Sequence, residues 1–318
     1  IMATYKDIKG TNIQVLSSDP TNPLIGQIWY NSTLGTLKGL EFGAAAWSTG
    51  GNMTTAGTAL SSAGTQTAGL AIAGANRVSN TEEYNGSSWT NGGTYFAPQG
   101  SSRLAAAGTQ TAALAFGGTN DPDRTGSYNG SSWTQVGNMV TGEVRLAGCG
   151  TQTAALSMGG DRLSNPTAQE WNGSSWTAGG NMVAAAEELA GCGTQTAGLA
   201  FGGKNPQLTS TEEYDGSSWT NGGNLTTGRF ALSGAGLQTA ALAFGGTTGS
   251  NFLAATEQYD GSSWTNSSSM SSGRKYMGGC GTQTAGLGCG GTAPNGNETT
   301  ATEEFTGAGP VTVKLSGS

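Results

Sequence analysis

The 318-residue chain is rich in glycine and poor in charge, and this composition limits the classes of protein to which it can belong. Glycine contributes 56 residues, charged residues make up 10%, and the formal net charge is −7, with no run of Lys or Arg. Phosphate backbones bind clustered cations, so we expect no nucleic-acid partner. No apolar stretch approaches the roughly 20 residues that span a bilayer, which excludes insertion into a membrane by a helix. The composition favours an all-β protein with many tight turns.

The first 40 residues are predicted to form a β-hairpin that stands apart from the rest of the chain. Strand-like residues at 26–31 and 37–38 flank a polar turn over residues 32–35. Two interpretations stay open for residues 1–40: a docking segment that attaches the protein to a partner, or a strap that packs on the following domain. The segment lacks the apolar core of a secretory signal, which indicates assembly in the cytoplasm.

The rest of the chain is dominated by a repeat of about 43 residues, which two independent markers define. Gly-Thr-Gln-Thr-Ala begins at Gly64, Gly108, Gly150, Gly193 and Gly281, with a Leu for Thr variant at Gly236. A Trp followed by Thr or Ser occurs at Trp47, Trp89, Trp133, Trp176, Trp219 and Trp264. Both markers give six repeats, and six repeats of this length predict a six-bladed β-propeller over residues 41–306.

Each repeat predicts four short strands. The first ends at the Gly of Gly-Thr-Gln-Thr, and the second runs into a Gly pair, as in Leu114 to Gly118. The third carries Glu-Glu-Tyr, and the fourth begins at the Trp after an Asn-Gly or Asp-Gly turn. Such dipeptides favour hairpins because both central turn residues need positive φ. Strand, Gly pair, Tyr strand and Trp strand together resemble the kelch motif, which implies a kelch-like propeller.

Ring closure is predicted by pairing of the first and last strands. Glu303 to Phe305 matches a third strand without a following Trp strand, and Ala44 to Trp47 supplies one without preceding strands. Glu41-Phe42 also resembles a third strand and competes for that position. Residues 307–318 are predicted to be a C-terminal tail strand, and we expect Val311 to Leu315 to pair with the N-terminal segment.

Variable loops on one face are the candidate ligand-binding surface. In an up-and-down blade the second-to-third and fourth-to-first loops share one face, and here only those loops vary in length and content. Neutral drift in solvent-exposed turns is the alternative. The candidate residues are Arg77, Tyr95, Phe96, Asp121, Asp123, Arg124, Asp161, Arg162, Lys204, Asn205, Asn251, Phe252, Asn295 and Asn297. Residues that begin the first strands are expected to surround the channel mouth on the same face, among them Arg103, Arg145, Arg229 and Arg274. Their mixed signs favour mutual pairing and solvation, and a polar ligand is the alternative.

The remaining chemistry-bearing residues receive structural interpretations. The Tyr and Trp that recur at one spacing are expected to pack between blades, and the paired acids such as Glu82-Glu83 and Glu212-Glu213 to line a solvated strand edge. Cys149, Cys192 and Cys280 share one repeat position, which Ala occupies elsewhere, and Cys289 takes an apolar position. We expect four free, buried cysteines, as in a reducing compartment.

The sequence predicts neither an enzyme nor a cofactor or metal site. The chain has no histidine, the commonest general base and metal ligand. Adjacent acids in a strand point to opposite faces, so they cannot act as a carboxylate pair.

Two segments resemble proteins of tailed phages. The pattern Asn22-Pro23, Gly26 to Asn31, Leu37-Lys38 resembles parts of tail fibres and appendages of marine cyanophages, and the repeats resemble kelch-like proteins that such phages encode. The resemblance implies a virion structural protein, assembled in the bacterial cytoplasm. Its partners would be other virion proteins and host surface polysaccharide, which the propeller would meet as an adhesin or tail appendage. A capsid-decorating or cementing protein and a cellular lectin-like scaffold are the alternatives, and an enzyme such as a lyase with a tyrosine base comes last.

Overall fold

The computed structural model describes residues 13–75, 79–95, 101–161, 167–204 and 208–315, and all regular structure in them is β-strand. No helix in these ranges is long and apolar enough to cross a membrane. The chain divides into a small unit of residues 1–45 and 307–318 and a large unit of residues 46–306.

The described residues form seven four-stranded sheets, whereas the sequence predicted six. Six of the seven lie in the large unit, and neighbouring strands within each are antiparallel. In strand order they are β5 (Ser61–Thr65), β6 (Ala68–Ile72), β7 (Thr81–Tyr84), β8 (Trp89–Asn91); β9 (Ala105–Gly108), β10 (Ala113–Phe116), β11 (Thr125–Tyr128), β12 (Trp133–Gln135); β13 (Ala147–Gly150), β14 (Ala155–Met158), β15 (Thr167–Trp171), β16 (Trp176–Asn181); β17 (Ala190–Thr194), β18 (Ala197–Phe201), β19 (Thr211–Tyr214), β20 (Trp219–Asn221); β21 (Ser233–Leu237), β22 (Ala240–Phe244), β23 (Thr256–Tyr259), β24 (Trp264–Ser267); and β25 (Gly278–Thr282), β26 (Ala285–Cys289), β27 (Thr302–Thr306), β4 (Ala46–Thr49).

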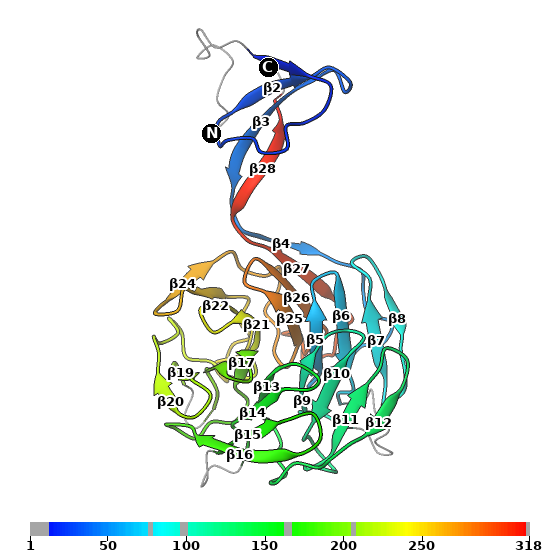
Figure 1. Cartoon of the computed structure of the whole chain (residues 1–318), viewed down its shortest axis with the longest axis vertical. Coiled ribbons are helices and arrows are strands. Elements are labelled where there is room, and N and C mark those ends of the chain that lie inside the picture. Colours follow the sequence, from blue (N-terminus) through cyan, green and yellow to red (C-terminus); the bar gives the residue numbers. More distant parts are fainter. Residues whose placement is uncertain (1–12, 76–78, 96–100, 162–166, 205–207, 316–318) are drawn as a thin grey trace. The chain divides into compact units, whose positions relative to one another are not determined.

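The six sheets of the large unit are arranged around their first strands (Figure 1). These strands contact one another in sequence order, β5 with β9 and onward to β25, and β25 contacts β5. The sixth sheet takes its outer strand from the start of the unit, since Phe305 lies opposite Trp47 and Thr306 opposite Ala46. The Thr282–Ala285 pair lies at the same end of that sheet as Thr306, so both chain connections leave the large unit from the side of the invariant turns.

The seventh sheet forms the small unit and was not predicted as a sheet. It consists of β1 (Gln14–Leu16), β2 (Ile28–Asn31), β3 (Thr36–Gly43) and β28 (Gly309–Lys314), with β1 parallel to β2. The expected hairpin is present as β2 and β3, and the expected tail strand pairs beside β3. The predicted start of the large unit at residue 41 was wrong: Glu41 and Phe42 continue β3, because Val311 and Pro310 offer them a pairing partner.

Asp19 holds a loop against one face of the small sheet. Its carboxylate accepts hydrogen bonds from the Trp29 indole at 3.0 Å, the Asn31 amide at 2.8 Å and the Lys38 ammonium at 2.6 Å. These donors, Lys38 first, lower the pKa of Asp19 to about 2. Trp29 is fully buried, so the small unit has its own core on this face.

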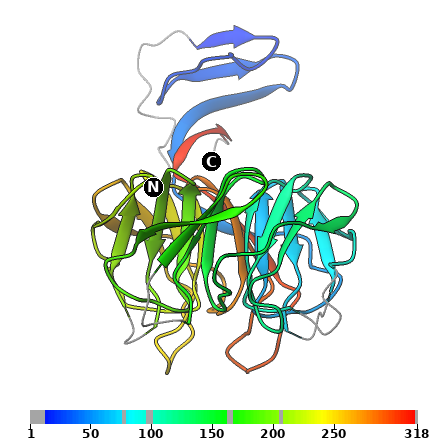
Figure 2. The same cartoon turned by 60° about the horizontal axis from the view of Figure 1, so that its bottom comes forward.

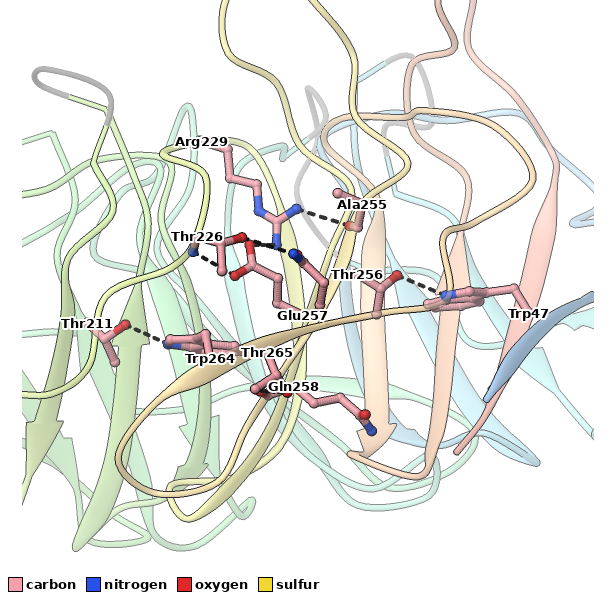
Figure 3. A network of polar contacts seen from close by, with 11 residues as sticks. Trp47, Thr211, Thr226, Arg229, Ala255, Thr256, Glu257, Gln258, Trp264 and Thr265 are labelled. Carbon is pink, nitrogen blue, oxygen red and sulfur yellow. Dashed lines mark hydrogen bonds and ion pairs between the residues drawn. The ribbon is translucent and has the colours of Figure 1, made fainter. Parts of the chain in front are cut away.

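The repeated aromatic residues pack between neighbouring sheets of the large unit, as predicted. In five of the six sheets the indole N–H of the fourth-strand Trp donates to a threonine hydroxyl of the preceding sheet, as from Trp264 to Thr211 and from Trp47 to Thr256, both at 2.9 Å (Figure 3). Trp219 donates instead to the Gly180 carbonyl of the preceding sheet. The third-strand Tyr hydroxyl donates to a glutamate of the preceding sheet, as from Tyr128 to Glu83 at 2.6 Å. These bonds satisfy the polar ends of buried aromatic rings.

The glutamine of every Gly-Thr-Gln-Thr turn also joins two sheets. Its side-chain amide donates to backbone carbonyls of the preceding sheet, as from Gln110 to Tyr84 at 2.6 Å and to Gly69 at 3.0 Å. The glycine that begins the same turn cannot be replaced by a residue with a side chain. At Gly64, for example, φ is +102°, and a Cβ would lie 2.2 Å from the Ala68 carbonyl oxygen. The invariance of this turn therefore has a structural cause.

Candidate functional site

Six equivalent residues surround one end of the central channel, and we call them the mouth ring. Each lies five positions before the glycine of a Gly-Thr-Gln-Thr turn. They are Ala59, Arg103, Arg145, Glu188, Ala231 and Tyr276. None is glycine, yet all have left-handed backbone conformations with φ between 52° and 63°. Non-glycine residues adopt this conformation at a cost of about 1–2 kcal/mol, so the surrounding structure must impose it.

A closed circuit of backbone hydrogen bonds imposes this conformation. Arg103 N donates to Ala59 O, Arg145 N to Arg103 O, and Glu188 N to Arg145 O. Ala231 N donates to Glu188 O, Tyr276 N to Ala231 O, and Ala59 N to Tyr276 O, with all six distances between 2.8 and 3.1 Å. Each sheet therefore contributes one donor and one acceptor, and the bonds link the sixth sheet to the first.

The mouth ring encloses a cavity of about 90 Å³ with an apolar floor. The floor consists of the six residues that follow the mouth ring in sequence: Leu60, Leu104, Leu146, Leu189, Leu232 and Met277. Beyond it the channel is lined by small residues, including Cys149, Cys192 and Cys280. The mouth is on the variable face, because Lys204 and Thr292 of the second-to-third loops pair with Glu187 and Lys275, which directly precede mouth residues.

Charge at the mouth is unevenly paired. The Arg145 guanidinium lies 2.9 Å from a Glu187 carboxylate oxygen and 3.4 Å from Glu188. Arg103 lies 3.7 Å from Glu188 and over the ring of Tyr276, 5.5 Å from its centroid. Burial, together with a hydrogen bond to Glu188, raises the pKa of Tyr276 well above its usual range. Glu188 is thus shared by three neighbours.

Two of the four arginines predicted at the mouth do not lie there. Arg229 is fully buried, with its guanidinium 2.9 Å from Glu257 and donating to the Ala255 carbonyl at 3.0 Å (Figure 3). Arg274 forms the equivalent ion pair with Glu303 at 2.7 Å. Arg229 and Arg274 lie seven residues before the glycine of their turn, whereas Arg103 and Arg145 lie five residues before theirs. This difference in position was visible in the sequence and could have distinguished the two pairs.

The predicted loop residues are not all surface groups. Tyr95 is only 1% exposed and packs edge-on against Trp133, with ring centroids 5.1 Å apart, so its assignment to a binding surface was wrong. Tyr95 follows its Trp by six residues, and the other repeats also bury an apolar side chain at this position: Met53, Met139, Met182, Leu225 and Met270. Arg77, Phe96, Arg162 and Asn205 lie outside the described residues.

The other predicted loop residues remain at or near the surface. Asp161, Lys204, Asn251, Asn295 and Asn297 are exposed. Arg124 pairs with Asp121 at 2.8 Å, and Asp123 accepts a hydrogen bond from Asn138. Phe252 is half-buried beneath the Lys275 ammonium, which lies 4.6 Å from its ring centroid. These residues are dispersed over several loops, whereas the mouth ring brings four polar side chains to one cavity.

The paired acids are not a solvated strand edge, as the sequence had suggested. Glu82 is fully buried and accepts hydrogen bonds from the backbone N–H groups of Thr54 and Thr55. Glu212 accepts from Val183 and Ala184 in the same way, and burial raises its pKa. The second acid of each pair accepts the tyrosine hydroxyl of the next sheet, as Glu83 does from Tyr128. Both acids therefore stabilise loops and sheet contacts.

The described residues contain no group of three or more acidic or cysteine side chains that could hold a metal ion. All four cysteines are free and buried, as the sequence predicted. Burial raises the pKa of Cys149 to about 12 and also raises those of Cys192 and Cys280 well above their usual range. Such thiols are poor nucleophiles at neutral pH.

A second surface feature, which the sequence reasoning missed, lies on the small unit. Ten large apolar side chains are exposed in the described part of the chain, and seven of them belong to this unit. The seven are Val15, Leu24, Ile25, Tyr30, Leu34, Phe42 and Val311. Val15 and Tyr30 are cross-strand neighbours and share the face opposite Trp29. The sequence signal for this surface was the run of three consecutive apolar residues in β2, Ile28 to Tyr30, because such a run places apolar side chains on both faces of a strand.

Comparison with known proteins identifies the fold. No protein-family description matches the sequence, and no curated protein matches it. The solved structure of YjhT matches with a TM-score of 0.69 at 12% sequence identity, over 82% of this chain and 99% of that one. The chain is therefore a structural neighbour of YjhT with a propeller fold of kelch-like type.

Proposed function

We propose that this protein is a non-enzymatic structural component of a phage particle, which attaches through its small unit and uses the variable face of its propeller for recognition of host surface glycan. The six sheets of the large unit are its six blades, and the mouth-ring hydrogen bonds with the β27–β4 pairing close the ring. The resemblance of residues 22–38 and of the repeats to phage proteins supports the assignment to a particle.

The observation that carries the proposal is the concentration of exposed apolar side chains on the small unit. Val15 is 66% exposed and Tyr30 37%, on the sheet face that Asp19 and its loop leave uncovered. Apolar patches on soluble proteins mark contact surfaces, because covering them removes apolar area from water. A neighbouring particle protein is the partner that fits this surface.

The large unit has a different surface character. Only Val140, Val183 and Leu237 are large, apolar and exposed among its described residues. Its two chain connections leave from the side of the invariant turns, so the variable face carries no connection to the small unit. A rigid scaffold with variable loops and a polar cavity on one face is suited to recognition.

A decorating or cementing protein is the second candidate, and one observation favours it. An adhesin that stacks sugars on aromatic rings needs exposed rings in its variable loops, whereas Tyr95 is buried and Phe252 is half-buried beneath Lys275. Glycan recognition by this protein would therefore depend on polar contacts at the channel mouth.

The first experiment is immunogold labelling of purified particles of the encoding phage. Label on particles supports the proposal, and its position separates the candidates: tail or fibre tips indicate an adhesin, and an even distribution over the head indicates decoration. Absence of label from every particle refutes the proposal.

Matched variants test the attachment surface. Leu24→Ser, Ile25→Ser and Leu34→Ser together remove three exposed apolar side chains from the small unit, and Val140→Ser, Val183→Ser and Leu237→Ser remove three from the large unit. We expect the first triple variant to lose incorporation into particles and the second to retain it. Equal incorporation of both would contradict attachment through the small unit.

A further inference from the structure

We propose that the channel mouth binds a carboxylate group of a ligand and that Arg103 is its main hydrogen-bond donor. The inference rests on the proposed recognition of glycan by the variable face and adds the chemistry of the ligand: an acidic sugar rather than a neutral one. Three properties of the cavity lead to this assignment.

The first property is an uncommitted guanidinium. The Arg103 guanidinium forms no hydrogen bond with any residue that the structure describes, although its side chain is only 30% exposed. Its ion pair with Glu188 is long at 3.7 Å, and its remaining contact is with the face of Tyr276. Arg229 of the same chain shows the contrast, since its guanidinium bonds both Glu257 and a backbone carbonyl. Guanidinium groups bind carboxylates through two parallel hydrogen bonds, so Arg103 retains a free donor edge.

The second property is an excess of donors over acceptors. Glu188 is the shared partner of Arg103, Arg145 and Tyr276, and Glu187 is already engaged by Arg145 at 2.9 Å. Lys275 adds a further positive charge beside Tyr276, 5.5 Å from its ring centroid. Of these charged groups Arg103, Arg145 and Glu188 line the cavity itself, so two cations there face one carboxylate, in a protein whose net charge is −7. One added carboxylate would balance the local charge.

The third property is the size and lining of the cavity. About 90 Å³ accommodates a carboxylate and the carbon that bears it, but not a complete sugar ring. The floor of leucines and one methionine offers no hydrogen-bond partner, so the ligand's polar contacts must come from the mouth ring above it. The rest of an acidic sugar would extend outward toward the variable loops.

The fold does not explain why Arg occupies position 103. The mouth-ring hydrogen bonds use backbone atoms alone, and Ala59 and Ala231 complete the circuit as well as the larger residues do. Replacing Arg103 therefore leaves this scaffold intact, which makes the residue suitable for a binding test.

The test is titration of the full-length protein with sodium glucuronate, and with glucose as the neutral probe of the same ring size, followed by ligand-observed nuclear magnetic resonance. We expect wild type to bind glucuronate but not glucose, and Arg103→Gln to weaken glucuronate binding at least tenfold. Arg103→Lys should recover only part of the affinity, because an ammonium lacks the two-pronged geometry.

Arg124→Gln is the matched control, since it removes one positive charge from the same face outside the cavity. It should bind glucuronate as wild type does, and thermal unfolding should show that each variant is folded. The proposal is overturned if wild type binds no glucuronate at millimolar concentration, if Arg103→Gln binds it unchanged, or if Arg124→Gln loses as much as Arg103→Gln. Particle labelling is measured separately, so failure here would leave the proposed attachment to a particle standing.

Discussion

The buried ion pair between Arg229 and Glu257 permits a prediction about stability. The equivalent position of another repeat, Gln169, supports the expected size of the effect. Arg229 is 0% and Glu257 1% exposed, and the guanidinium donates to Glu257 and to the Ala255 carbonyl. Replacing Arg229 with Met keeps much of the side-chain volume but removes both bonds. Among the described residues, the Glu257 carboxylate then keeps the backbone N–H of Thr226, at 2.7 Å, as its one donor.

The expected cost of Arg229→Met is about 4 kcal/mol, because each charge-assisted hydrogen bond contributes about 1.5–3 kcal/mol and removal of one partner strands a buried charge. Adding Glu257→Gln should recover about 2 kcal/mol of this loss. Gln169 shows why, since it holds the equivalent position in the third sheet and accepts the Thr141 N–H at 3.1 Å without a charge. A neutral acceptor therefore suffices for the loop.

Urea unfolding followed by tryptophan fluorescence measures the free energies. Arg124→Met is the control, as the same substitution in the partly exposed pair with Asp121 should cost less than about 1 kcal/mol. The reasoning is refuted if the double variant is no more stable than Arg229→Met alone. That result would mean that the lost guanidinium contacts, rather than the stranded carboxylate, account for the destabilisation.

Three further predictions follow from the contacts between sheets and from the cysteines. Thr211→Val leaves the buried Trp264 indole N–H without an acceptor and should lower the free energy of unfolding by about 1–3 kcal/mol (Figure 3). Thr265→Val removes an exposed hydroxyl and should change that free energy by less than about 0.5 kcal/mol. Thermal unfolding of the two variants compares their stabilities. Burial, and then hydrogen bonds to glutamates of the neighbouring sheet, raise the pKa values of Tyr84, Tyr128, Tyr214 and Tyr259 from 10.0 to about 12. Their folded-state pKa values exceed the unfolded ones, so their stabilisation is complete below pH 10 and is lost between pH 10 and about 12. Because the chain has eight tyrosines, the tyrosinate absorbance of each of the four is taken as the difference between the folded protein and its Tyr→Phe variant, and ionisation of any of them well below pH 11 would contradict the prediction. Native protein at neutral pH should not react with iodoacetamide at any of its four cysteines, because all are buried, and mass spectrometry after short exposure checks this.

The sequence predicted the strands well because the constraints that place them are local and repeated six times. Gly64 and its equivalents mark the ends of first strands, since a Cβ there would meet a carbonyl oxygen, and the Tyr–Trp spacing marks the third and fourth. The seventh sheet depends instead on pairing of residues 38–43 with 309–314. The pairing of Val311 to Leu315 with the N-terminal segment was predicted and is confirmed, but nothing local specified its register or the parallel strand β1 that completes the sheet. Figure 2 shows the repeated sheets of the large unit from a second direction.

The candidate site was predicted only in part, because the interpretation treated charged residues near a strand start as equivalent. Arg103 and Arg229 differ by two positions in the repeat, and that offset places one side chain at the cavity and the other in an internal ion pair. Glu82 was taken as solvated because acids are usually exposed. Its burial depends on hydrogen bonds from the backbone N–H groups of Thr54 and Thr55, and the loop brings these groups to the carboxylate only when it is folded.

The mouth ring separates the requirements of the fold from those of recognition. Six backbone donors and six backbone acceptors close the circuit, so the fold requires only that each mouth residue adopt a left-handed conformation. Glycine meets that requirement at the lowest conformational cost, yet none of the six sheets uses it there. Alanine occupies two positions, and Arg, Arg, Glu and Tyr occupy the other four. The side chains of these four line one cavity, although the backbone circuit does not require them. Neither the backbone circuit nor the apolar floor needs these polar groups, which is why we propose a binding role for the mouth.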